Sequence, residues 1–170
     1  SIDEPSLGFV PITNTNDDEL IRIYDKSTEG IGIDVQIHLH SLNQFKIPIQ
    51  TENIDILTCE FASNHQNKID KKYLDEYDKF MRVGICRTNI NSIISDALDS
   101  GDLNLEDDPV NGIRSLIDSK ERIKKNYELS QQLYGDRLKY VGPDCGLSAW
   151  EPPEIAVELL KRTCDVVKNR

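Results

Sequence analysis

Histidine, glutamate and cysteine side chains stand at or just beyond the ends of successive hydrophobic runs in this sequence. His38 and His40 close the run DVQIHLH, Glu60 lies near the end of NIDILTCEF, and Cys145 occupies the turn GPDCG. Residues two apart in a strand point to the same side, so the two imidazoles are expected to share a face. Imidazole, carboxylate and thiolate are all zinc ligands, and such a mixed N/O/S set suits zinc best. Single His, Glu or Cys residues at strand ends are more often structural, so the spacing by itself raises a zinc site only as a hypothesis.

The elements that must position these residues follow an alternating order. Apolar and alternating stretches predict strands at 1–3, 34–40, 53–61, 80–87 and 137–142. Helical patterns with apolar faces predict helices at 17–28, 91–101, 108–135 and 152–169. Strands that alternate with helices predict an α/β fold with a parallel sheet or barrel. In such folds the binding and catalytic residues lie at the carboxyl ends of the strands, and the candidate residues occupy these positions.

Composition and charge exclude several classes of protein. The net charge of −10 and the absence of a basic stripe argue against nucleic-acid binding. No apolar run is long enough to cross a membrane, and the first residues lack a signal-peptide pattern. Four widely scattered cysteines do not form a secreted disulfide framework and favour a reducing, cytoplasmic location. There is neither a GxGxxG nor a GxxxxGK[ST] motif to support nucleotide binding.

Two of the remaining cysteines are expected to be structural, whereas Cys86 could face either side of its predicted strand. Cys59 precedes Glu60 in a predicted strand and should therefore face a covering helix rather than the candidate site. Cys164 lies near the apolar face of the last predicted helix. Free cysteines are among the most buried residues, so we expect both to be core thiols.

Four motifs in this order resemble one enzyme family. They are IDEP (2–5), IHLH (37–40), DILTCEFA (55–62) and GPDCGL (142–147). They resemble the C-terminal catalytic barrel of cobalamin-independent methionine synthase, in which PDCGL is likewise followed by a helix of the type PExAxELL. The resemblance covers nearly the whole chain.

The resemblance implies a fold and an activity. It implies that residues 1–170 are a single domain, namely the C-terminal part, with about five strands, of a (β/α)₈ TIM barrel. The missing strands are expected from an N-terminal segment or another chain, because the sequence lacks an initiator Met and supplies too few strands. The implied enzyme is a zinc-dependent methyltransferase of methionine biosynthesis, which transfers a methyl group from a donor such as a methyl-folate to the thiol of homocysteine.

The resemblance also assigns roles to residues. It implies that Asp3, with Glu4 beside it, binds the amine of homocysteine, and that Glu60 and Cys145 bind zinc. The family's His-x-Cys zinc pair corresponds to His38-x-His40 in one register. In the other register His40 is the ligand His, and Leu42 stands where the Cys should be. We prefer the first register, because it leaves four zinc ligands.

The absence of the family's His and the identity of the methyl donor leave alternatives open. Many family members carry a His, thought to be a proton donor, where this chain has Arg87. His65 is a substitute, although a solvated loop position is the simpler interpretation of it. The chain could therefore be a non-catalytic relative of one barrel half. A related alkyl transfer to another thiol also stays open, because the resemblance places acceptor specificity largely outside this chain. The methyl donor also stays open between a polyglutamylated folate, a simpler folate or pterin, and a corrinoid protein.

Overall fold

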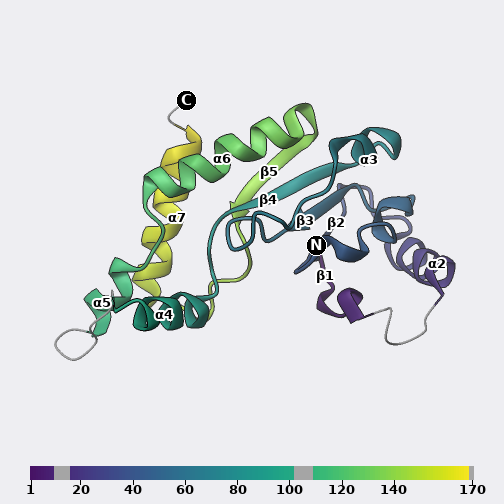
Figure 1. Ribbon diagram of the computed structural model, residues 1–170. Helices are drawn as coiled ribbons and strands as arrows, with labels where there is room; N and C mark the ends of the chain where they lie inside the picture. Colours follow the sequence, from purple (N-terminus) through teal and green to yellow (C-terminus); the bar gives the residue numbers. More distant parts are fainter. Residues whose placement is uncertain (10–15, 102–108, 169–170) are drawn as a thin grey trace.

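A parallel five-stranded sheet forms the centre of the protein (Figure 1). The computed structural model describes residues 1–9, 16–101 and 109–168. Its strands are β1 (Ile2–Asp3), β2 (Gln36–Leu39), β3 (Ile56–Cys59), β4 (Phe80–Cys86) and β5 (Leu138–Pro143). All four neighbouring pairs are parallel. The predicted α/β class and the five predicted strands are therefore confirmed.

The order of the strands resembles part of a barrel. The strands lie in the sheet in the same order as in the chain, from β1 to β5. A doubly wound sheet reverses its strand order at a switch point, whereas a (β/α)₈ barrel adds each strand beside the one before it. The sheet is also curved, as the 2.6 Å distance between Lys139 Nζ on β5 and Asp34 Oδ2, just before β2, shows. In a flat sheet these two strands would stand about 14 Å apart. The sheet is consistent with part of a TIM barrel.

Helices connect the strands. The α-helices are α2 (Asp17–Thr28), α3 (Lys71–Glu76), α4 (Ile90–Asp99), α5 (Pro109–Ser115), α6 (Lys120–Tyr134) and α7 (Pro153–Lys168). Short 3-10 helices are η1 (Pro5–Phe9), η2 (Leu42–Gln44), η3 (Pro48–Gln50) and η4 (Gly135–Arg137). Helix α2 matches its prediction, and the Asn16 side chain caps it by accepting from the amide of Asp18. Helix α3 was not predicted, because six residues hold too little periodicity to show.

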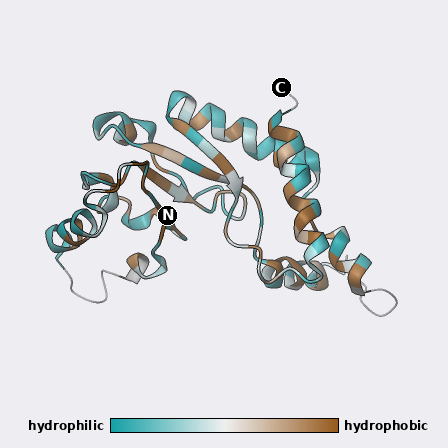
Figure 2. Ribbon diagram, turned by 180° about the vertical axis from the view of Figure 1, so that it is seen from behind, coloured by the Kyte–Doolittle hydropathy of each residue, from teal (hydrophilic) through white to brown (hydrophobic). Residues whose placement is uncertain are grey.

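The two faces of the sheet differ in chemistry. Alternate residues of β2, β3 and β4 are buried and apolar on one face, including Leu39, Leu57 and Val83. In Figure 2, hydrophobic and hydrophilic residues both occur along α6 and α7, as expected of helices with one face on the protein and the other exposed. The opposite face is polar, because Asp3, His38, Thr58 and Arg82 share one line of register across the strands. The polar side chains that could form a site therefore lie on the face of the sheet opposite its apolar, helix-covered face.

The single helix predicted at 108–135 is wrong. Two helices, α5 and α6, occupy the described part of this range, with a break before the α6 N-cap residue Ser119. The break lets the buried Asp118 carboxylate accept hydrogen bonds from the backbone N–H and Nε of Arg87. A continuous helix would not deliver this carboxylate to the end of β4, so the buried ion pair overrides the helical pattern.

The two cysteines expected in the core differ. Cys59 is fully buried, as predicted, on the apolar face of β3. Cys164 is exposed, so its assignment to the core is wrong. Ile155, Leu159 and Thr163 form the buried face of α7 at four-residue spacing, and this turns Cys164 outward. No helix in the described residues is long and apolar enough to span a bilayer.

A candidate metal centre at the carboxyl end of the sheet

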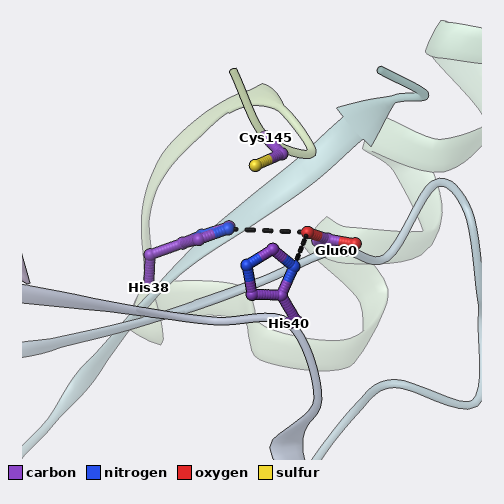
Figure 3. A group of neighbouring side chains, drawn as sticks. All are labelled: His38, His40, Glu60 and Cys145. Atoms are coloured by element: carbon purple, nitrogen blue, oxygen red, sulfur yellow. Dashed lines mark ion pairs between the residues drawn. The ribbon is translucent and has the colours of Figure 1, made fainter. Parts of the chain in front are cut away.

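Four potential metal-binding side chains converge at the carboxyl ends of the strands (Figure 3). One ligand atom from each of His38, His40, Glu60 and Cys145 lies within 4.8 Å of the other three. Glu60 Oε1 stands 2.7 Å from His40 Nδ1 and 3.5 Å from His38 Nε2. His38 belongs to β2, His40 and Glu60 directly follow β2 and β3, and Cys145 lies in the turn after β5. The parallel strands thus bring together residues that are up to 107 positions apart in the sequence.

The burial of His38 and its unpaired ring nitrogen are consistent with a metal ligand. Its side chain is only 11% exposed, and its Nε2 has no hydrogen-bond partner among the described residues. The 3.5 Å contact with Glu60 is too long for a hydrogen bond. Leaving a buried polar nitrogen unpaired costs about 1–3 kcal/mol, which coordination to a metal would offset.

The donor set and its spacing also fit zinc. Two imidazoles, one carboxylate and one thiol match the ligands that zinc prefers. Ligand atoms around one tetrahedral zinc are separated by about 3.3–3.8 Å, as follows from bond lengths of about 2.0–2.3 Å. The separations here reach no more than 4.8 Å, so small side-chain rotations would be sufficient to bind the ion.

Asn67 fixes two of the candidate ligands relative to each other. Its Nδ2 donates to the backbone carbonyls of His40, at 2.9 Å, and Glu60, at 3.4 Å. Its Oδ1 accepts from the backbone N–H of Leu42 at 2.8 Å. A buried amide therefore joins the segments that follow β2 and β3. Sequence reasoning missed Asn67, because a polar loop residue carries no local sign of such a role.

Asp144 connects the turn of Cys145 to the segment after Glu60. Its buried carboxylate accepts hydrogen bonds from the backbone N–H groups of Ala62 and Ser63 at 3.0 and 2.7 Å. It also accepts from the Ser63 hydroxyl at 2.6 Å. Burial raises the pKa of the Asp144 carboxyl to about 6, and these hydrogen bonds oppose that rise. Gly84 leaves room for this contact, because a Cβ there would lie 2.0 Å from Asp144 Oδ1.

Thr88 holds the backbone of Cys145 itself. The Thr88 hydroxyl accepts from the Cys145 N–H at 3.0 Å, and the Thr88 carbonyl accepts from Trp150 Nε1 at 2.9 Å. The backbone N–H of Asp144 donates to the Cys86 carbonyl at 2.9 Å. The loop after β4 therefore sets the position of the thiol.

The two acidic residues of IDEP point in different directions. Asp3 pairs in register with His38, is 71% exposed, and lies with Oδ1 4.0 Å from His40 Nε2. Glu4 accepts from the N–H and hydroxyl of Ser6. It also contributes, after burial, to a raised pKa of Tyr24 on α2. The structure brings Asp3 to the candidate metal ligands but does not bring the Glu4 carboxylate there.

Neither Arg87, which stands where the resembled family has its His, nor the substitute His65 belongs to the converging group. Arg87 is held by Asp118, with Nη2 2.8 Å from Oδ1. His65 Nε2 lies 2.9 Å from Asn126 Oδ1, and its ring packs against Phe61. His65 is exposed, as its loop position indicated.

A cavity of about 310 Å³ opens on the polar face beside the candidate ligands. Its lining residues come from β1 to β4 and from the turn after β5: Ser1, Asp3, Gln36, His38, Thr58, Arg82, Asp144, Cys145 and Gly146. The cavity therefore contains two candidate metal ligands, two carboxylates and a guanidinium, which is a polar lining suited to a small charged molecule.

Comparison with known proteins gives one informative similarity. No family model matches the chain. A methionine synthase from Methanocaldococcus jannaschii is 28% identical over 176 residues, which cover 98% of this chain and 47% of that protein. The chain thus spans about half the length of this curated relative. The similarity extends over the whole chain and supports a relationship with methionine synthases.

Proposed function

We propose that this chain carries the zinc site, and part of the amino-acid site, of a methyltransferase that forms methionine from homocysteine. The convergence of His38, His40, Glu60 and Cys145, with one buried imidazole nitrogen unpaired, carries the proposal. The similarity to a methionine synthase along the whole chain supports it. A related alkyl transfer to another thiol would use the same residues.

The four converging side chains would hold the zinc ion. Zinc, when bound, lowers the pKa of a coordinated thiol, so that homocysteine can react as a thiolate at neutral pH. Asn67, Thr88 and Asp144 would keep the ligand segments in place through their hydrogen bonds. A rigid set of supporting residues of this kind commonly determines how well a metal site works.

Asp3 would hold the amine of the substrate. Its carboxylate lies on the polar face of the sheet, in the same cavity as His38 and Cys145. An ammonium bound there would place the thiol of the same molecule near the metal ligands. Glu4 is a weaker candidate for this role, because its carboxylate already accepts from Ser6.

The rest of the barrel would come from an N-terminal segment or from another chain. Within the described residues, β1 and β5 each pair on one side only, and open parallel edges are uncommon. Additional strands would cover these edges and close the cavity over the substrate, which would be homocysteine together with a methyl donor such as a methyl-folate. A cytoplasmic location is part of the same proposal.

A non-catalytic role is the second candidate. The observation that favours it is the ion pair between Arg87 and Asp118, because it fills the place where the resembled family has a proton donor. In this case the chain would keep the fold and the metal without turnover.

Metal analysis with a matched control tests the zinc site. Cys145→Ala should lower the zinc content of the purified protein to well below one ion per chain. Cys164→Ala should leave it unchanged, because Cys164 is exposed on α7 and outside the cluster. Equal zinc in wild type and Cys145→Ala would contradict the ligand assignment.

An activity assay separates the two candidates. Zinc-loaded protein, together with the remaining part of its barrel, should form methionine from homocysteine and one of three donors: a methyl-folate, a methyl-pterin or a methyl-corrinoid protein. Stoichiometric zinc without methyl transfer from any of them would favour the non-catalytic role.

A further inference from the structure

Arg82 is a positively charged residue in the candidate substrate cavity that the proposed function leaves unexplained. It lies on β4, on the polar face of the sheet, and lines the cavity with His38 and Cys145. Its Nη2 donates a 2.9 Å hydrogen bond to the carbonyl of Pro143. This hydrogen bond places the guanidinium at the base of the turn that carries Cys145.

Within the described residues, Arg82 forms no ion pair, in contrast to Arg87 and Arg137. Asp144 is the acidic residue that most favours the charge of Arg82, but the Asp144 carboxylate accepts hydrogen bonds from Ala62 and Ser63. Burial lowers the pKa of Arg82, which means that the surroundings disfavour its charge. A guanidinium has five N–H donors, and a partly buried one without an anion is unfavourable.

The position of Arg82 complements that of Asp3. Asp3, His38, Thr58 and Arg82 are consecutive partners across β1 to β4, so their side chains share one face and one level. Three strand spacings, about 14 Å between backbones in a flat sheet, separate the two charged residues, and both side chains line the same cavity. The cavity thus offers the Asp3 carboxylate on β1, the Arg82 guanidinium on β4, and the candidate metal ligand His38 on β2, which lies between them in the strand order.

We propose that Arg82 binds the α-carboxylate of an amino-acid thiol whose ammonium group pairs with Asp3. The proposal rests on the proposed function, because it concerns the substrate of the same site. Arginine matches a carboxylate with two parallel hydrogen bonds, which gives geometric selectivity as well as affinity. The site would therefore select α-amino-acid thiols over aminothiols that lack the carboxylate.

Gly142 provides the space that this arrangement requires. A Cβ at Gly142 would lie 2.9 Å from Arg82 Nη2. The absent side chain lets the guanidinium lie against β5 and reach Pro143, near the candidate metal ligands.

Binding of three related ligands tests the proposal. The zinc-loaded protein, with the remaining part of its barrel, is titrated calorimetrically with L-homocysteine, 3-aminopropane-1-thiol and 4-sulfanylbutanoate. The second ligand lacks the carboxylate and the third lacks the ammonium group. Wild type should bind homocysteine at least about tenfold more tightly than either analogue, since each charge-assisted contact is worth this much or more.

Two variants assign each contact to its residue. Arg82→Gln should weaken binding of homocysteine and 4-sulfanylbutanoate by about tenfold or more, and leave binding of 3-aminopropane-1-thiol unchanged. Asp3→Asn should weaken homocysteine and 3-aminopropane-1-thiol instead. Arg82→Lys should retain part of the carboxylate selectivity that Arg82→Gln loses, because lysine keeps the charge but not the paired hydrogen bonds. Zinc content and thermal unfolding show whether each variant is intact.

The outcomes separate this proposal from the proposed function. Equal binding of homocysteine by wild type and Arg82→Gln would overturn the role of Arg82 while the function stands. Equal weakening of all three ligands would also overturn it, and would indicate that Arg82 is a structural counter-ion or pairs with a carboxylate of the remaining barrel. If wild type holds zinc and binds no thiol, both proposals are wrong. If Arg82→Gln does not fold, the wild-type ligand series and Arg82→Lys still decide.

Discussion

Replacement of Gly84 by alanine should disrupt the connection between β4 and the turn of Cys145. The added Cβ would lie 2.6 Å from Asp144 Cα and 2.0 Å from Asp144 Oδ1. Carbon atoms make favourable contacts from about 3.5 Å, so the backbone of the turn would have to move by close to 1 Å. Because the closest carbon belongs to the backbone, no change of rotamer can relieve the overlap.

The expected cost of this substitution follows from the contacts that would be lost. Overpacking of this kind costs about 1–3 kcal/mol. Displacement of the Asp144 carboxylate would also weaken three hydrogen bonds to a charged acceptor, each worth about 1.5–3 kcal/mol. The usual benefit of alanine over glycine in a strand, about 0.5–1 kcal/mol, offsets only part of this. We expect a loss of about 2–5 kcal/mol in the free energy of unfolding.

Urea denaturation of the metal-free and zinc-loaded protein measures the effect. Gly84→Ala should lower the denaturation midpoint and also weaken zinc binding, because the same turn positions Cys145. Gly146→Ala is the matched control, since a Cβ there meets nothing within 4 Å although the residue adjoins the same ligand. It should change stability by less than about 0.5 kcal/mol. Equal stability and zinc affinity in Gly84→Ala and wild type would refute the packing argument.

Three further predictions concern other buried polar groups. Asn67→Ala should weaken zinc binding by about tenfold or more, measured by competition with a chelator, because the segments after β2 and β3 lose their shared amide; unchanged affinity would show that Asn67 is not a positioning residue. Asp118→Asn should lower the free energy of unfolding by about 3–5 kcal/mol, because two arginines lose a fully buried partner, whereas Asp165→Asn, in the half-exposed pair with Lys120, should cost less than about 1 kcal/mol. Burial lowers the pKa of Lys79, so the unfolded chain binds more protons than the folded chain as this lysine titrates. Stability should therefore rise with pH as it approaches the ordinary lysine pKa, and Lys79→Met should lose this contribution, which thermal unfolding at pH 8 and pH 10 would detect.

Local patterns in the sequence were sufficient for the five strands, for α2 and for the placing of the candidate ligands. Alternation of apolar residues located all five strands, and the capped amphipathic pattern located α2, because both depend on neighbours within a few positions. Since parallel strands end at one edge, residues at their carboxyl ends could be expected to meet there. His38, His40, Glu60 and Cys145 do converge, but their binding of zinc stays a prediction.

Only the tertiary structure decided how these residues are held and which neighbours share their cavity. Asn67 bonds across 25 and 27 positions, Thr88 across 57 and Asp144 across 82, so no local pattern could reveal them. The same holds for Asp118, whose ion pair with Arg87 interrupts a helical pattern. Such contacts depend on the register of strands that are distant in the sequence, and a buried polar group must find its partner wherever that register places one.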